Sequence, residues 1–203
     1  MSSDVTVRTE TDSLGAVEIP LDAYWGIHTS RAWTNFPISH RPISIHPDLV
    51  RALAIIKQAA ARANRDMGVL GETTAAWIDD ACGRVRDGEF HDQFVVDIIQ
   101  GGAGTSTNLN ANEAIANIAL EEHGYPKGAY DVLHPIDDVN RSQSTNDVYP
   151  SAVKLALCFA PKRLVEEHTL LRVASTAKGE QFTGVLKVGR TRRRGGGQRG
   201  RDP

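Results

Sequence analysis

The sequence predicts a mainly α-helical protein with a small extended region near its N-terminal end. Apolar residues recur at helical spacing in four segments, and alternate with polar residues in short stretches between Val5 and Ile19. An apolar share of 40% in 203 residues suffices for one large or two small domains with an ordinary core. The four expected helical segments are 47–68, 72–88, 112–123 and 147–178.

The helix boundaries follow from capping and breaking residues. Pro47 and Asp48 begin the first helix, and glycines end the first three, at Gly68, Gly88 and Gly124. Pro161 lies inside the fourth apolar segment, where proline costs about 3 kcal/mol because it removes a backbone hydrogen bond and clashes with the preceding turn. We therefore expect that helix to kink or break at Pro161.

Two segments lack a helical pattern. Residues 24–36 concentrate aromatic side chains around Gly26 and predict a packed loop, whereas residues 91–99 predict a short extended segment. His91 and Asp92 are the only neighbouring pair that suggests a metal site. Because no third ligand follows at a matching spacing, we expect no metal.

Charge and cysteine content indicate a cytoplasmic protein. The N-terminal residues show neither a secretory signal nor a membrane-spanning run. Cys82 and Cys158 belong to no ligand motif, so we expect two buried thiols in a reducing compartment. Residues 192–203 contain five arginines and one aspartate, so the rest of the chain is acidic although the net charge is only −2. Nucleic-acid binding by this tail is an alternative, but the tail lacks the interleaved aromatic residues that stack on bases.

The most informative stretch is the glycine-rich bend at residues 100–104, which leads into hydroxyl and amide side chains at 105–108. Glycines permit a tight turn and a close approach to a ligand. We expect residues 105–108 to cap a helix starting near Asn112, whose free N–H groups favour a carboxylate or phosphate. Residues 142–147 form a second junction of this kind, so the pair suits a ligand with two carboxylates.

The bend matches none of the common glycine motifs. No lysine follows its last glycine, as a P-loop requires, and the Gly-x-Gly-x-x-Gly and Gly-x-Ser-x-Gly patterns are absent. Taken alone, the bend could be an ordinary loop and residues 142–147 a simple helix cap.

The two junctions together resemble a known family. The ordered set Gly101-Gly102-Ala103-Gly104-Thr105-Ser106, then Asn140, then Ser142-Gln143-Ser144-Thr145-Asn146-Asp147 resembles the aspartase/fumarase superfamily, and within it the aspartate ammonia-lyases. The resemblance covers about residues 8–191 and implies an L-aspartase/fumarase-like fold: an N-terminal helical domain with short strands, followed by a long-helix bundle. Fumarases usually read Gly-Ser-Gly-Thr and Ser-Ser-Asn-Asp, so this sequence favours the aspartases, with a fumarate hydratase as the alternative.

The resemblance implies reversible elimination of ammonia from L-aspartate to give fumarate, without an organic cofactor. Hydrogen-bond donors must then stabilise a dianionic intermediate, which explains the hydroxyl and amide side chains. Arg31 is a candidate carboxylate partner, although an exposed structural arginine is an equal alternative. The expected substrate-binding residues are Thr105, Ser106, Ser144, Thr145, Asn146, Thr191 and Arg31.

In the family, the catalytic base is a serine in a later Gly-Ser-Ser loop, and active sites form between the subunits of a tetramer. We find no such loop in this sequence, so we expect a catalytically incomplete form, with a non-catalytic binding or oligomerisation fragment as a further alternative. The expected parts are a lyase domain at 1–146, the start of the central bundle at 147–191, and an Arg/Gly-rich tail at 192–203 that is foreign to the family.

Overall fold

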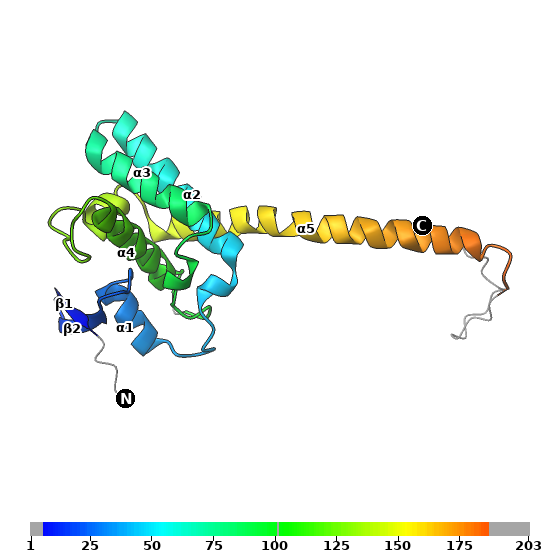
Figure 1. The fold of residues 1–203 in the computed structure, drawn as a ribbon, viewed down its shortest axis with the longest axis horizontal. Coiled ribbons are helices and arrows are strands. Elements are labelled where there is room, and N and C mark those ends of the chain that lie inside the picture. Colours follow the sequence, from blue (N-terminus) through cyan, green and yellow to red (C-terminus); the bar gives the residue numbers. More distant parts are fainter. Residues whose placement is uncertain (1–5, 101, 187–203) are drawn as a thin grey trace. The chain divides into compact units, whose positions relative to one another are not determined.

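A computed structural model describes residues 6–100 and 102–186, and it confirms the mainly helical fold (Figure 1). The chain divides into two units, one ending at Leu157 and one beginning at Cys158. In chain order the strands are β1 (Val7–Asp12) and β2 (Gly15–Pro20), and the longer helices are α1 (Ile27–Asn35), α2 (Pro47–Asp66), α3 (Glu72–Arg86), α4 (Thr105–Glu122) and α5 (Thr145–Gln181). Three short helical segments are η1 (Ile43–Ile45), η2 (His91–Gln93) and the π-helical η3 (Pro135–Val139). No helix in this described part is long and apolar enough to cross a membrane.

The alternating pattern predicts a small extended region, and the structure shows it as two strands paired in an antiparallel hairpin. Val7 pairs with Pro20 and Asp12 with Gly15, which leaves a two-residue connection. The carboxylate of Asp12 accepts a hydrogen bond from the backbone N–H of Leu14 at 2.8 Å, which stabilises the turn. The predictions for α2 and α3 are also confirmed, to within two residues at each end.

Helix α4 lies at the centre of the first unit, and it is buried on all sides from Thr107 to Leu120 except for partly exposed Leu109 (Figure 1). Helices α1, α2 and α3 all pack against it. Its apolar residues Ala111, Ala114, Ile115 and Ile118 are fully buried together with Leu53 of α2 and Ile78 of α3. A helix that is buried all round is expected to be apolar all round, yet α4 also carries buried asparagines and a glutamate.

These polar side chains of α4 hold the loops around the helix. Asn110 accepts from Val95 N and donates to Gln93 O, while Asn117 accepts from Gly128 N and donates to Tyr24 O. Each side-chain amide therefore bonds a backbone N–H and a backbone C=O group of the loops. Buried backbone groups need such partners where no strand or helix supplies them.

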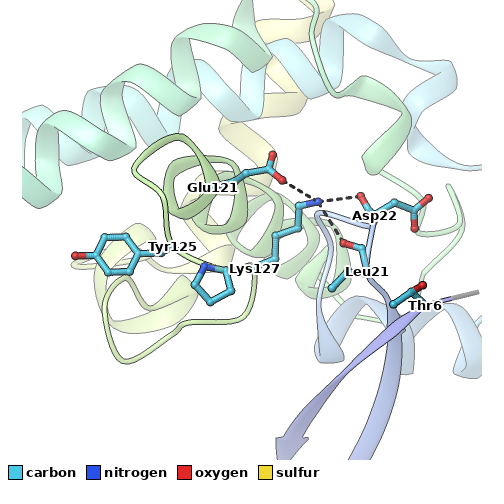
Figure 2. A pocket seen from close by; sticks show the side chains of 7 residues that line it. Thr6, Leu21, Asp22, Glu121, Tyr125 and Lys127 are labelled. Carbon is cyan, nitrogen blue, oxygen red and sulfur yellow. Dashed lines mark hydrogen bonds and ion pairs between the residues drawn. The ribbon is translucent and has the colours of Figure 1, made fainter.

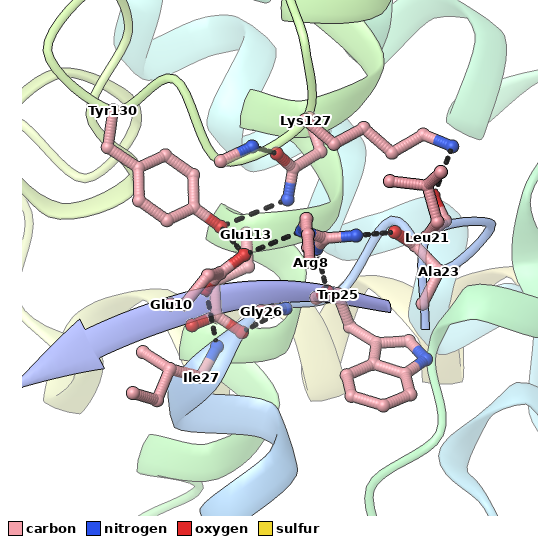
Figure 3. Close-up of polar contacts among 12 residues, drawn as sticks. Arg8, Glu10, Leu21, Ala23, Trp25, Gly26, Ile27, Glu113, Lys127 and Tyr130 are labelled. Atoms are coloured by element: carbon pink, nitrogen blue, oxygen red, sulfur yellow. Dashed lines mark hydrogen bonds and ion pairs between the residues drawn. The ribbon is translucent and has the colours of Figure 1, made fainter. Parts of the chain in front are cut away.

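A buried carboxylate of α4, Glu113, caps the start of α1 (Figure 3). It accepts from the backbone N–H groups of Gly26, His28 and Thr29 and from the Thr29 hydroxyl, at 2.6–3.1 Å. The free N–H groups and the positive end of a helix favour such a carboxylate. Burial raises the pKa of Glu113, and the hydrogen bonds from the Thr29 hydroxyl and from the backbone N–H groups of His28 and Gly26 oppose that rise.

The charged neighbours of this cap come from β1 (Figure 3). Glu10 accepts from Ile27 N at 2.8 Å and from the hydroxyl of Tyr130 at 3.2 Å. Arg8 pairs with Glu10 at 2.9 Å and donates to the carbonyls of Pro20, Ala23 and Trp25. The hairpin, the start of α1 and the centre of α4 are thus joined by one buried polar cluster.

Several expectations from the sequence are wrong in detail. Residues 27–35 form helix α1 rather than a loop, because Glu10 and Glu113 supply its cap from distant segments. Residues 91–93 form η2 rather than an extended segment. Helix α4 begins at Thr105 and not near Asn112, so residues 105–108 are its first turn.

The fourth expected helix also differs. Helix α5 continues through Pro161 without a break, because the proline removes only one hydrogen bond from a segment rich in helix-forming residues. Cys82 is buried as expected, but Cys158 is exposed. It lies in the second unit, where the described residues form only the rest of α5 and a short turn, so nothing in that unit covers its thiol.

Candidate functional site

The starts of α4 and α5 carry five of the residues predicted to bind substrate. Thr105 and Ser106 are the first two residues of α4, and Thr145 and Asn146 are the first two of α5, with Ser144 directly before it. The backbone N–H groups at the first positions of a helix have no partner within that helix. Both segments therefore present donors that suit an anion.

The structure brings these two helix starts together. The side-chain amide of Asn108, in the first turn of α4, donates to the hydroxyl of Thr145 at 3.1 Å. Gly104 packs against the ring of Tyr149, because a Cβ placed on this glycine would lie 2.5 Å from Cδ1 of that ring. Gly104 also has a φ of +84°, a conformation that glycine adopts without strain. The glycine bend and the second junction are thus in contact, and together they form the candidate site.

Gln100 fixes the bend from within. Its side-chain oxygen accepts from Thr107 N at 3.0 Å, and its amide donates to Asp97 O at 3.0 Å and to the Thr107 hydroxyl. Burial opposes the charge of Asp97, but hydrogen bonds from the Ser39 hydroxyl and from the backbone N–H groups of Ser39, His40 and Ile99 outweigh it and lower the pKa of the carboxyl to about 2. The described ends of the bend are therefore held in place.

The second junction is held in a similar way. Asn140 donates to Gln143 O at 3.0 Å, and Gln143 N donates to Asn140 O at 3.1 Å, which closes a tight loop before α5. Ser142, inside this loop, has a φ of +59°, uncommon for a residue other than glycine. The hydroxyl of Ser144 then accepts from Asn146 N at 3.2 Å and caps α5.

Some buried polar atoms near these helix starts have no partner among the described residues. They are Oδ1 of Asn108, both amide atoms of Asn112 and Oε1 of Gln143. An unsatisfied buried polar group typically costs about 1–3 kcal/mol. The buried region near the candidate site therefore contains polar side chains whose hydrogen-bonding capacity is not fully used.

Arg31 has its hydrogen bonds at the N-terminal hairpin. Its Nε and Nη2 donate to the two carboxylate oxygens of Asp12 at 2.7 and 2.6 Å, and Nη2 also donates to Gly15 O at 3.0 Å. The bidentate face of the guanidinium is thus engaged by an internal carboxylate, and a substrate carboxylate would have to displace Asp12 to use it. Thr191, another predicted binder, and the 192–203 tail lie outside the described residues.

We expect the Arg31→Gln substitution to raise the pKa of Asp12. The hydrogen bond from Arg31 lowers that pKa from 3.8 to about 2, so the stabilisation from this pair is present above pH 3.8 and is lost as the pH falls through about 2. An NMR titration of the Asp12 carboxyl should therefore show a pKa near its ordinary value in the variant. In a control, Arg65→Gln, which removes the exposed partner of Asp66, should leave Asp12 unchanged. An unchanged Asp12 pKa in Arg31→Gln would contradict the pairing.

A hollow of about 680 Å³ lies away from the candidate site (Figure 2). Its lining includes Leu21, Asp22, Glu121 and Lys127. The ammonium of Lys127 lies 3.2 Å from the carboxylate of Glu121 and donates to the carbonyls of Leu21 and Asp22 (Figure 2). This charge is already compensated, and no predicted binding residue lines the hollow.

The described residues contain no group of three or more His, Cys, Asp or Glu side chains that could hold a metal ion. His91 contacts the carbonyl of Val85 through Nε2 at 2.8 Å. Sequence reasoning missed Lys57, which is fully buried and donates to Asn140 at 2.7 Å. The helical spacing could have revealed it. Lys57 lies on the same face of α2 as Leu53 and Ala61, so the pattern places it at a core position.

Fold and site together define a helical protein in which the starts of two helices adjoin through the hydrogen bond from Asn108 to Thr145. The chain belongs to the lyase family of the aspartase/fumarase superfamily, because a family model described as "Lyase" matches residues 15–195.

Individual relatives agree with this membership. The aspartate ammonia-lyase of Pseudomonas canavaninivorans is 56% identical over 191 residues, which are 94% of this chain and 40% of that protein. A crystal structure titled fumarate lyase:delta crystallin, from Brucella melitensis, is 52% identical with a TM-score of 0.89, and the match covers 92% of this chain and 44% of that one. A class II fumarase from Schistosoma mansoni is 32% identical with a TM-score of 0.79, covering 92% of this chain and 39% of that one. The chain thus spans about 40% of the length of the curated relatives that it matches.

Proposed function

We propose that this chain carries the carboxylate-binding part of an aspartate ammonia-lyase, which converts L-aspartate reversibly to fumarate and ammonia. The observation that carries this proposal is the hydrogen bond from Asn108 to Thr145, which joins the starts of α4 and α5. Two adjoining helix starts offer separate donor sets for the two carboxylates of aspartate. The 56% identity to an aspartate ammonia-lyase supports aspartate as the substrate rather than malate.

In this proposal the predicted residues bind and stabilise, and none of them is the base. Thr105, Ser106, Ser144, Thr145 and Asn146 donate to the substrate carboxylates and to the negative charge that develops when a proton leaves the neighbouring carbon. Thr191 contributes from the segment after α5. Arg31 contributes only when it releases Asp12.

The proposal extends to assembly and location. Residues 1–146 form the substrate domain, 147–191 begin a helical bundle, and 192–203 are a separate tail. We propose a homotetramer built through α5, because Leu157, Leu164 and Leu171 expose more than half of their surface within their own units. Free thiols at Cys82 and Cys158 are consistent with a cytoplasmic location.

A chimera tests the proposed activity. Residues 6–186 replace the matching part of the Pseudomonas canavaninivorans aspartate ammonia-lyase, and fumarate formation is followed by absorbance with L-aspartate or L-malate. We expect fumarate from aspartate, and a loss of about tenfold in kcat/KM when the chimera carries Thr145→Val, since one donor is removed. A folded chimera that forms no fumarate from aspartate would contradict the proposal. Activity on malate alone would favour the fumarate hydratase alternative.

A further inference from the structure

Lys57 is the most unusual charged residue in the first unit. It lies in the middle of α2, and its side chain is fully buried between apolar helix positions. Lysine is almost never fully buried unless it is paired, because removing an ammonium from water is costly. A lysine at this position therefore requires a reason other than packing.

The described residues supply Lys57 with a neutral partner and no carboxylate. Its Nζ donates to Oδ1 of Asn140 at 2.7 Å. The titratable group next to it is Cys82 of α3, but burial raises the pKa of that thiol, so Cys82 carries no charge at physiological pH. The partners that reach the site from α4 and from the end of η3, Asn108 and Asn140, are neutral amides. Burial accordingly lowers the pKa of Lys57 to about 7.

The acceptor of Lys57 belongs to the candidate site. Oδ1 of Asn140 accepts from Lys57 and also from the amide of Asn108 at 3.0 Å. The same amide of Asn108 donates its second hydrogen to the hydroxyl of Thr145. The amide of Asn140 also closes the loop before α5 by donating to Gln143 O. The side chain of Asn140 therefore links α2, α4 and the second junction.

We propose that Lys57 is a positioning residue of the carboxylate-binding site, whose ammonium orients Asn140 and, through Asn108, the hydroxyl of Thr145 toward the bound dicarboxylate. This inference rests on the proposed function. Hydrogen bonds from a charged donor are stronger than those from a neutral one, so the ammonium polarises and fixes the whole chain of amides. The buried positive charge also favours an anion bound at the neighbouring helix starts.

The test that needs no ligand compares amide hydrogen exchange in the 203-residue chain and in Lys57→Met. Gln143, Asp147 and Val148 report on the second junction, because their N–H groups donate to Asn140 O and Ser144 O. We expect their exchange to become about tenfold faster in the variant, and we expect no change in Lys162→Met, which removes an exposed lysine. Unchanged exchange at these three amides in a folded Lys57→Met protein would overturn the proposal.

The second test measures succinate binding between pH 6 and 9. We expect the affinity of the wild-type chain to fall as the pH rises through about 7, where Lys57 loses its proton. The Lys57→Met variant should bind about tenfold more weakly at pH 6 and should lose this pH dependence. Equal affinity and an equal pH profile in the two proteins would overturn the inference.

Two other outcomes are informative: the wild-type chain binds no succinate, or the Lys57→Met variant does not fold. If the wild-type chain binds no succinate, the proposed binding function fails, and the exchange measurement alone decides the role of Lys57. If Lys57→Met does not fold, Asn140→Ala is measured in its place, because it removes the acceptor and leaves the lysine. Faster exchange at Asp147 and Val148 in that variant supports the proposal, and unchanged exchange contradicts it.

Discussion

Replacing Gly104 by alanine is expected to destabilise the first unit by about 3 kcal/mol or more and to abolish dicarboxylate binding. Two effects add at this position. Its φ of +84° strains any residue with a side chain, and the new Cβ would overlap the ring of Tyr149. Moving the bend away from this ring to relieve the overlap would disturb the contact between the starts of α4 and α5 that the candidate site requires. Denaturant unfolding and succinate titration measure the two consequences.

Gly102 supplies the matched control for this substitution. It has a φ of +73°, but a Cβ placed there would meet nothing within 4 Å. Gly102→Ala therefore carries the backbone strain without the overlap, and we expect a cost of about 1 kcal/mol. Equal losses of stability in the two variants would show that the contact between Gly104 and Tyr149 is unimportant.

The Glu113→Gln substitution is expected to lower the free energy of unfolding by about 2–3 kcal/mol. Both oxygens of Glu113 accept hydrogen bonds, and the glutamine would place an N–H₂ group against at least one backbone N–H of the α1 start. A donor would then face a donor in a fully buried place. Thermal unfolding should show the loss as a fall in Tm of several degrees.

Glu72→Gln is the control for this change, because the side chain of Glu72 is 86% exposed in the first turn of α3. We expect it to change stability by less than about 0.5 kcal/mol. Glutamine also has the shape of a protonated glutamic acid, and burial raises the pKa of Glu113. A Glu113→Gln protein as stable as wild type would therefore show that this side chain is neutral in the fold, contrary to its role as a charged cap.

Much of the local fold could be predicted from the sequence. The extended N-terminal region, α2 and α3 follow from alternation, from Pro47 at a helix start and from glycines at helix ends, all of which act within a few residues. The two junctions of the site were also visible, because glycine, hydroxyl and amide residues there precede apolar helices.

The parts that could not be predicted depend on partners far away in the chain. Helix α1 is capped by Glu113, which lies 84–87 positions further along the sequence. The asparagines of α4 are buried because their amides bond loops such as 93–95, which pack against the helix from elsewhere in the chain. Lys57 is joined to the candidate site only through Asn140, 83 positions away. Periodicity carries no information about such pairs.

The most direct test of the central claim is an NMR titration of the 203-residue chain with fumarate, using amide signals assigned along the backbone. We expect the signals of Thr105, Ser106, Thr145 and Asn146 to shift together and to saturate at one fumarate concentration, because the two helix starts adjoin. A monocarboxylate such as acetate should shift them less, since it fills only one of the two donor sets. Shifts that occur at one helix start only, or that occur at neither, would contradict the claim that α4 and α5 together bind a dicarboxylate.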